Sequence, residues 1–225
     1  MKKLLFSSIL LIIFNISFAQ ISKDNKYDNK HISQKYFGIK GGVNFAIIHG
    51  QDYIIDPEFK TSFIVGLFFE IPLSNQLIIQ PELLFSMKGW KKKFTFESYD
   101  ENGNYIETIN TEYSRNLNYL EIPILGKITL NEINNIRPNI YFGPCFGFNV
   151  SATHTEKIVG GGTNIFSVSM EEMNILEVGL NQGIMLDLNN KFIIDCRYSI
   201  SLTEIDKGGS GAKNTVLSII IGYKF

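Results

Sequence analysis

Several residue types that mark functional sites are scarce in this chain. It has three histidines, two cysteines and one tryptophan in 225 residues. The basic stripe that a nucleic-acid-binding protein presents is missing, so nucleic acid is not expected as a partner. After the N-terminal segment, no apolar run approaches the roughly 18 residues of a membrane-spanning helix. If the mature protein enters a membrane, it must therefore cross it with strands.

The first feature that is present is an N-terminal export signal. Residues 1–3 are basic, residues 4–18 are apolar, and small residues occupy positions 17 and 19. This pattern predicts a secretory signal peptide over residues 1–19, cleaved between Ala19 and Gln20. No cysteine follows the cleavage site, so an N-terminal lipid anchor is not expected. Loss of the two lysines changes the formal net charge from −1 to −3.

The clearest strand pattern lies at the C-terminal end of the chain. Because side chains alternate along a strand, residues 215–225 present one wholly apolar face that ends in aromatic residues. That face consists of Leu217, Ile219, Ile221, Tyr223 and Phe225. A strand with one face in lipid shows this alternation.

The same alternation recurs seven more times after a polar lead at residues 20–35. The expected strands cover residues 36–45, 62–71, a segment from 77, a segment ending near 130, and residues 140–151, 175–186, 192–202 and 215–225. The sixth is the least regular, because its neighbourhood from Met170 also fits an amphipathic helix and because Gln182 falls on its apolar face. Short connections alternate with long ones at residues 46–61, 89–118, 152–174 and 203–214.

This organisation predicts an all-β fold: an eight-stranded antiparallel up-and-down transmembrane β-barrel over residues 36–225. Outer-membrane barrels have an even strand number, short periplasmic turns and long external loops. In hydrocarbon, an open sheet edge would leave backbone groups unpaired, and closure of the sheet removes the edges.

The polar faces of the strands then line the lumen and place charges of both signs in it. A narrow barrel cannot hold lone charges, so these side chains should pair across the lumen. The predicted luminal network is Lys40, Glu70, Glu82, Lys88, Glu121, Lys127, Glu177, Asp195, Arg197 and Lys224. Cys145 and Cys196 fall on opposite faces, so no disulfide is expected between them.

Six short motifs, in order, resemble those of a known family. They are residues 36–44 (YFGIKGGVN), 80–83 (QPEL), 119–125 (YLEIPIL), 143–144 (GP), 195–198 (DCRY) and 222–225 (GYKF). The chain resembles the PorT-like outer-membrane β-barrel proteins over residues 36–225. The resemblance implies an eight-stranded barrel in the outer membrane of a Gram-negative cell. It also implies that Tyr223 and Phe225 form a terminal signal for the barrel-assembly machinery. The namesake belongs to a protein-secretion system.

Two patterns could indicate chemistry in the loops. His154 has Ser151, Thr153, Thr155 and Glu156 nearby in sequence, a combination that some hydrolases place at a barrel rim. Catalysis would require a base oriented by a third group, and sequence proximity alone does not provide one. A solvated loop histidine is the expectation for His154, as for His31 and His49.

The second pattern is an acidic and amide-rich segment around Gly103. Asp100, Asn102, Asn104 and Glu107 resemble a calcium loop, but the glycine is at the fourth position and not the sixth. Asn-Gly is a strong hairpin-turn signal, and a hairpin tip explains the segment. The third and fourth strands are therefore expected to project beyond the bilayer core and to meet at this turn. No metal or cofactor is therefore expected.

Trp90 and the three lysines that follow it should lie at the outer rim of the third strand. Either Trp90, Lys91, Lys92 and Lys93 contact lipopolysaccharide phosphates, or an interfacial tryptophan is followed by solvated lysines. The second interpretation is favoured.

The predicted function is that of a non-enzymatic, monomeric outer-membrane barrel of structural or interaction type, whose long loops form the recognition surface. Its partners would be outer-membrane lipid and the assembly machinery. The alternatives are a narrow porin, a component of a secretion apparatus, and a secreted lipocalin-like barrel with its apolar face inside.

Overall fold

The computed structural model describes residues 35–50, 57–101, 103, 105–158 and 162–225. The predicted cleavage site at Ala19 and Gln20, and His31, lie outside these residues. Among the residues described, no helix is long and apolar enough to span a membrane.

Nine strands account for most of the described chain. They are β1 (Tyr36–His49), β2 (Lys60–Pro72), β3 (Leu77–Tyr99), β4 (Tyr105–Thr129), β5 (Ile136–Ile158), β6 (Thr163–Ser167), β7 (Leu176–Leu188), β8 (Phe192–Ser201) and β9 (Lys213–Lys224).

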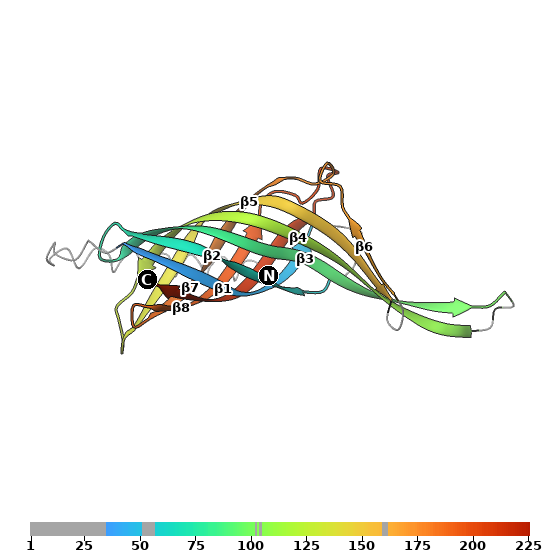
Figure 1. The fold of residues 1–225 in the computed structure, drawn as a ribbon, viewed down its shortest axis with the longest axis horizontal. Helices are drawn as coiled ribbons and strands as arrows, with labels where there is room; N and C mark the ends of the chain where they lie inside the picture. Colours follow the sequence, from blue (N-terminus) through green and yellow to red (C-terminus); the bar gives the residue numbers. More distant parts are fainter. Residues whose placement is uncertain (1–34, 51–56, 102, 104, 159–161) are drawn as a thin grey trace, which may run out of the picture. The chain divides into compact units, whose positions relative to one another are not determined.

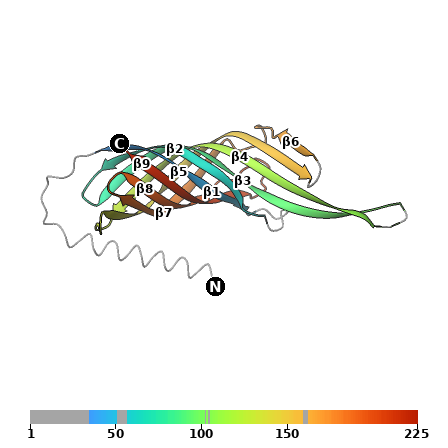
Figure 2. The ribbon, with the colours of Figure 1, turned by 60° about the horizontal axis from the view of Figure 1, so that its bottom comes forward.

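Eight of these strands form a closed ring (Figures 1 and 2). The order is β4-β3-β2-β1-β9-β8-β7-β5, and pairing of β4 with β5 closes it. β6 pairs with β5 outside the ring. All pairs are antiparallel, including the pairing of β1 with β9 that joins the two ends of the barrel. The predicted eight-stranded up-and-down barrel is thus confirmed.

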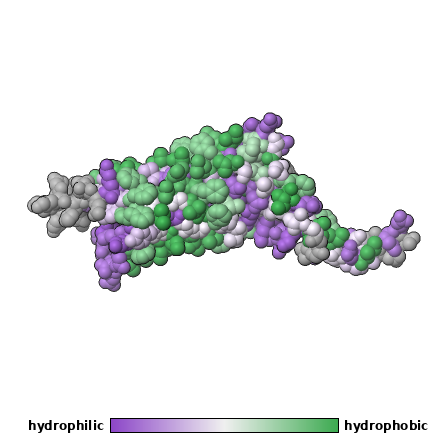
Figure 3. Space-filling model, viewed as in Figure 1, coloured by the Kyte–Doolittle hydropathy of each residue, from purple (hydrophilic) through white to green (hydrophobic). Residues whose placement is uncertain are grey.

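The apolar faces of the strands point out of the barrel. Leu217, Ile219 and Ile221 are 42%, 52% and 68% exposed, whereas Lys40 and Arg197 are 3% and 1% exposed. On the side that Figure 3 shows, the surface of the barrel body is mainly hydrophobic. This arrangement excludes the lipocalin-like alternative, because that alternative requires the apolar face inside and the charged face in water.

One end of the barrel carries the short connections and is called the turn end below. Asn189 and Asn190 connect β7 to β8 with φ of 50° and 57°, and the Lys191 N–H donates to the Leu188 carbonyl at 3.1 Å. Asparagine tolerates this left-handed backbone because its short side chain can hydrogen-bond locally. The start of β1 and the C-terminus of the chain meet at this end, where the Phe225 N–H donates to the Phe37 carbonyl at 2.8 Å.

Aromatic side chains cluster around the C-terminus. The Phe225 ring stacks on Phe37 with centroids 6.0 Å apart and meets Tyr223 edge-on at 5.4 Å. Tyr223 in turn contacts Phe192 at 5.3 Å. A belt of aromatic residues at the edge of the apolar band is typical of outer-membrane barrels.

The opposite end, called the extension end, agrees with prediction only in part. The third and fourth strands were expected to project as a hairpin, and β3 and β4 do so over 23 and 25 residues. Residues 152–174 were expected to be a loop, but β5 continues to Ile158 and β6 pairs with it. The segment from Met170 contains turns and an isolated bridge, not a helix. β7 has the predicted facing, with Gln182 directed outward between Phe142 and Tyr198.

Candidate functional site

The barrel lumen holds eleven buried charged side chains. They are the ten predicted ones, Lys40, Glu70, Glu82, Lys88, Glu121, Lys127, Glu177, Asp195, Arg197 and Lys224, together with Asp187. Each is at most 7% exposed. Their ion pairs divide them into a central, a turn-end and an extension-end cluster.

The central cluster joins two cations to two carboxylates. Arg197 donates through Nη1 and Nη2 to both oxygens of Glu82 at 2.8 and 3.0 Å, and through Nη2 to Asp195 at 2.9 Å. Lys40 bridges the same two carboxylates at 2.8 and 2.9 Å. The Tyr141 hydroxyl donates to Asp195, and the Arg197 guanidinium lies 5.5 Å from the Tyr141 ring centroid. A bidentate, fully partnered arrangement of this kind offsets the cost of burying charge.

The turn-end cluster has the same balance. Glu70 accepts from Lys127 at 2.5 Å and from Lys224 at 2.9 Å, and Lys224 also pairs with Asp187 at 3.0 Å. Gln80 accepts from Lys127 at 3.0 Å and donates to Glu82 at 2.5 Å. Gln80 thus connects this cluster to the central one.

The extension-end cluster has one cation for two carboxylates. Lys88 Nζ lies 2.5 Å from both Glu121 and Glu177, and 4.8 Å from the Tyr119 ring centroid. Asn214 donates to the second oxygen of Glu177 at 2.6 Å. Asp187 and Asn214 were absent from the predicted network because residues 187–191 and 203–214 were assigned to connections. The alternation along β7 and β9 could have identified both residues, because they occupy the next inward-facing positions of these strands.

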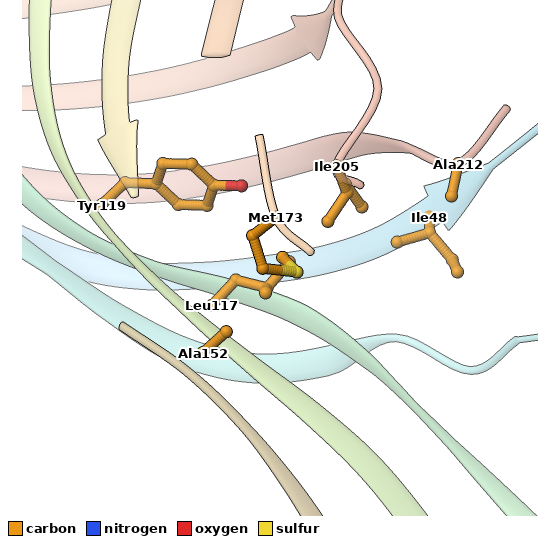
Figure 4. Close-up of a cluster of buried hydrophobic side chains, with 7 residues drawn as sticks. All are labelled: Ile48, Leu117, Tyr119, Ala152, Met173, Ile205 and Ala212. Atoms are coloured by element: carbon orange, nitrogen blue, oxygen red, sulfur yellow. The ribbon is translucent and has the colours of Figure 1, made fainter. Parts of the chain in front are cut away.

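An apolar cluster, called the plug below, lies at the extension end (Figure 4). It consists of Ile48, Leu117, Tyr119, Ala152, Met173, Ile205 and Ala212, all at most 4% exposed. Trp90, Val168 and Met170 pack against it. These residues come from β1, β4, β5 and the segments before β7 and β9. The charged lumen is therefore followed by an apolar layer at this end.

From the level of the plug toward the hairpin tip, the two faces of the sheet exchange character. On the outward face, Asn118 donates to Ser151 at 2.7 Å and Asn116 to Thr153 at 3.1 Å, where the barrel body presents Leu and Phe. On the inward face, apolar Leu117 follows the charged residues. Polar outward residues mark the limit of the hydrocarbon-facing band. The part of β3–β6 beyond this limit is called the extension.

One row of side chains crosses the inward face of the extension. The register places Trp90 opposite Arg115, Arg115 opposite His154, and His154 opposite Phe166, on four adjacent strands. Directly paired residues share a face and have Cβ atoms about 5 Å apart. Arg115 Nε is buried without a hydrogen-bond partner, and Nη2 has only Met173 Sδ at 3.2 Å. This row combines aromatic surfaces with a guanidinium that forms no ion pair with any described residue.

An aromatic ladder continues from this row toward the hairpin tip. Tyr113 stacks on His154 with centroids 5.8 Å apart and contacts Phe94 edge-on at 5.5 Å, and Phe94 stacks on Phe96 at 6.1 Å. Tyr113 donates to Glu156 at 2.8 Å. This hydrogen bond to a carboxylate raises the pKa of the Tyr113 phenol, because it favours the protonated hydroxyl.

The structure corrects the expected position of Trp90 and its lysines. Trp90 packs against the plug from the inside and is not an interfacial, lipid-facing residue. The register pairs Lys92 with Tyr113 on the inward face, and Lys91 and Lys93 lie on the outward face. The four residues of the alternative lipopolysaccharide contact are therefore divided between the two faces of β3, and the favoured interpretation of Trp90 as an interfacial residue is wrong.

The residues of the suspected hydrolase set are not brought together. His154 lies on the inward face, whereas Ser151 and Thr153 lie on the outward face and accept hydrogen bonds from Asn118 and Asn116. His49 Nδ1 lies 2.8 Å from Thr215 Oγ1, away from any carboxylate among the described contacts.

The acidic hairpin tip contains a turn. The Gly103 N–H donates to the Asp100 carbonyl at 3.0 Å, with φ of 83° at Gly103. Asn102 and Asn104 lie outside the described residues. Over the described part of the chain, no group of three or more His, Cys, Asp or Glu side chains is arranged to hold a metal ion.

A family model described as outer membrane protein beta-barrel domain matches residues 18–207. The chain belongs to this family. The closed ring of strands and its apolar exterior agree with membership of this family. No curated protein matches the sequence.

Solved structures with a similar fold include three outer-membrane proteins. Ail of Yersinia pestis is 14% identical, with 86% of this chain and all of that chain covered and a TM-score of 0.45. Neisserial surface protein A is 10% identical, with 86% and 100% covered and a TM-score of 0.43. Outer membrane protein W of E. coli is 9% identical, with 86% and 99% covered and a TM-score of 0.37. Sequence identities and TM-scores this low carry no information about ligands. The fold assignment rests on the strand pairing of this chain.

Proposed function

We propose that this protein is a non-enzymatic outer-membrane barrel that presents the extension as a recognition surface, with the phosphates and sugars of lipopolysaccharide as its ligand. The observation that supports this most is the row of Trp90, Arg115, His154 and Phe166 on the inward face of the extension. Arginine binds phosphate bidentately and stacks on aromatic rings. Lys91 and Lys93, on the opposite face just beyond the polar limit, add positive charge toward the surrounding leaflet.

The proposal includes the route to the membrane. The signal peptide would be cleaved between Ala19 and Gln20, and the aromatic C-terminus with Tyr223 and Phe225 would be bound by the barrel-assembly machinery. The extension would then face outward and the barrel would remain monomeric. We retain membership of the PorT-like subgroup, and with it a role in a secretion apparatus, as a proposal based on motif order alone.

The ligand proposal predicts a selective loss of binding. In phosphatidylcholine nanodiscs, Arg115→Gln should weaken binding of purified lipopolysaccharide by about tenfold or more, because charge-assisted hydrogen bonds contribute about 1.5–3 kcal/mol. Microscale thermophoresis with native and dephosphorylated lipopolysaccharide would measure this. Arg137→Gln is the matched control, because Arg137 lies at the turn end in an exposed pair with Glu132. Equal affinities of the two variants would refute the assignment of the site.

The narrow-porin alternative makes a different prediction. The dense ion pairs inside the lumen and the apolar plug favour a barrel that does not conduct. We therefore expect planar-bilayer recordings to show no reproducible conductance step. A step that shifts on Glu121→Gln or Arg197→Gln, which lie in the lumen, would instead support a conducting path.

A further inference from the structure

The three lumen clusters differ in formal charge. The central cluster has two cations and two anions, and so has the turn-end cluster. The extension-end cluster has Lys88 against Glu121 and Glu177. One negative charge is thus left over in a buried space beneath the plug, where an uncompensated charge is costly.

Among the described residues, Lys88 is the cation that pairs with these carboxylates. Lys60 also faces inward on β2, opposite Ala46, but no ion pair joins it to Glu121 or Glu177. Arg115 lies on the same strand and face, but it is six residues from Glu121, which corresponds to about 20 Å along a strand. The apolar plug, including Leu117 and Tyr119, lies between them. The pairs of the central cluster already satisfy one another.

Unpartnered amide groups lie beside the same cluster. Both polar atoms of Asn149, and Oδ1 of Asn214, are buried without a hydrogen-bond partner. Asn149 faces inward and pairs in register with Tyr119. Two residues along the same face, Gly147 has the side chains of Tyr119, Glu177 and Glu121 against it: a Cβ there would lie 3.3, 3.4 and 3.8 Å from their nearest atoms. The unpartnered amides therefore adjoin the place where the two carboxylates converge.

The extension-end cluster is also less completely enclosed than the central cluster. The side chains of Lys88, Glu121 and Glu177 are 5%, 6% and 9% exposed. Those of Lys40, Glu82 and Asp195 are fully buried. The carboxylates of this cluster are therefore not covered on every side by other side chains.

The extension-end cluster together with Asn149 and Asn214 is called the chamber below. We propose that the chamber binds one monovalent alkali cation of sodium size, held by carboxylate oxygens of Glu121 and Glu177 and by the amide oxygens of Asn149 and Asn214. Hard cations prefer oxygen ligands of these two kinds. One unit of positive charge brings the net charge of the chamber to zero, whereas a divalent ion would leave it with one excess positive charge.

Sodium dependence of folding tests the proposal. The full chain in phosphatidylcholine vesicles would be unfolded in urea and followed by the fluorescence of Trp90. Sodium chloride would be exchanged against N-methyl-D-glucamine chloride at constant ionic strength. Above the Kd, each tenfold rise in sodium should raise the folded-to-unfolded ratio tenfold. Glu121→Gln, which balances the chamber, should abolish this response, and Glu70→Gln in the balanced turn-end cluster should retain it.

A second variant keeps the test decisive if Glu121→Gln does not fold. Asn149→Ala leaves every charge in place and should shift the sodium response to several-fold higher concentration. An unresponsive wild type would overturn the proposal, and so would the same response in Glu121→Gln as in the wild type. Stability that follows pH and not sodium would also overturn it, because the excess charge would then be met by a proton.

Discussion

Arg197→Met should be among the most destabilising single substitutions in the barrel, lowering the free energy of unfolding by about 3–5 kcal/mol. Arg197 is 1% exposed and donates to both oxygens of Glu82 and to Asp195. Its removal leaves two buried carboxylates with a single lysine, Lys40. Urea titration in lipid vesicles, followed by Trp90 fluorescence, would measure the change.

Two further variants separate loss of charge balance from loss of packing. Arg137→Met removes a cation whose pair with Glu132 is more than one-third exposed, so it should cost about 0–1 kcal/mol. Adding Glu82→Met to Arg197→Met restores the balance and should recover part of the lost stability. If the double variant were less stable than Arg197→Met alone, the penalty would come from packing and not from unpaired charge.

Ile219→Arg should cost about 2–4 kcal/mol, because it places a charge near the middle of the lipid-facing band. Ile219 is 52% exposed and lies on β9 opposite Val43 and Cys196, midway between the aromatic C-terminus and the polar residues at the start of the strand. The same vesicle titration would measure this loss of stability. The loss should be smaller in detergent micelles, which rearrange around a charged side chain more easily than a bilayer does.

A matched substitution outside the band tests the cause. Ile106 is 57% exposed on the projecting hairpin, so Ile106→Arg should change stability by no more than about 0.5 kcal/mol. Similar costs at Ile106 and Ile219 would contradict the placement of β9 in hydrocarbon, because lipid depth would then play no part.

Much of the barrel was predictable because a single rule determines it. Alternation along each strand assigns Lys40, Glu82 and Arg197 to one face and Leu217 and Ile219 to the other, whatever the register. Strand closure then follows from the need to pair every backbone group in lipid. Even β7, whose Gln182 interrupts its apolar face, follows the rule, because neighbouring Phe142 and Tyr198 supply the lipid contact.

The extension was predictable only in part, because the Asn-Gly turn signal indicated the projecting β3–β4 hairpin but nothing indicated that β5 and β6 join it. Beyond the plug, residues such as Asn116 and Thr153 are polar on the outward face, so the alternation that indicates a membrane strand is inverted and the segment resembles a loop. The row from Trp90 through Arg115 to His154 also depends on a register shift between β4 and β5 at Asn118 and Tyr119. Local sequence does not determine such a shift. Asp187 was missed for a simpler reason, because the end of β7 was set two residues too early, at 186 and not at Leu188.

The length of the β3–β4 hairpin has an electrical consequence. β3 continues for eleven residues past Lys88, which corresponds to about 35 Å at ~3.3 Å per residue. Ionic screening at physiological salt acts over about 8 Å, so the far part of the hairpin does not sense the lipid headgroups. Residues 94–111 contain four carboxylates and no lysine or arginine. Whatever approaches the hairpin from outside thus first meets a negative potential, of opposite sign to the lysines at its base.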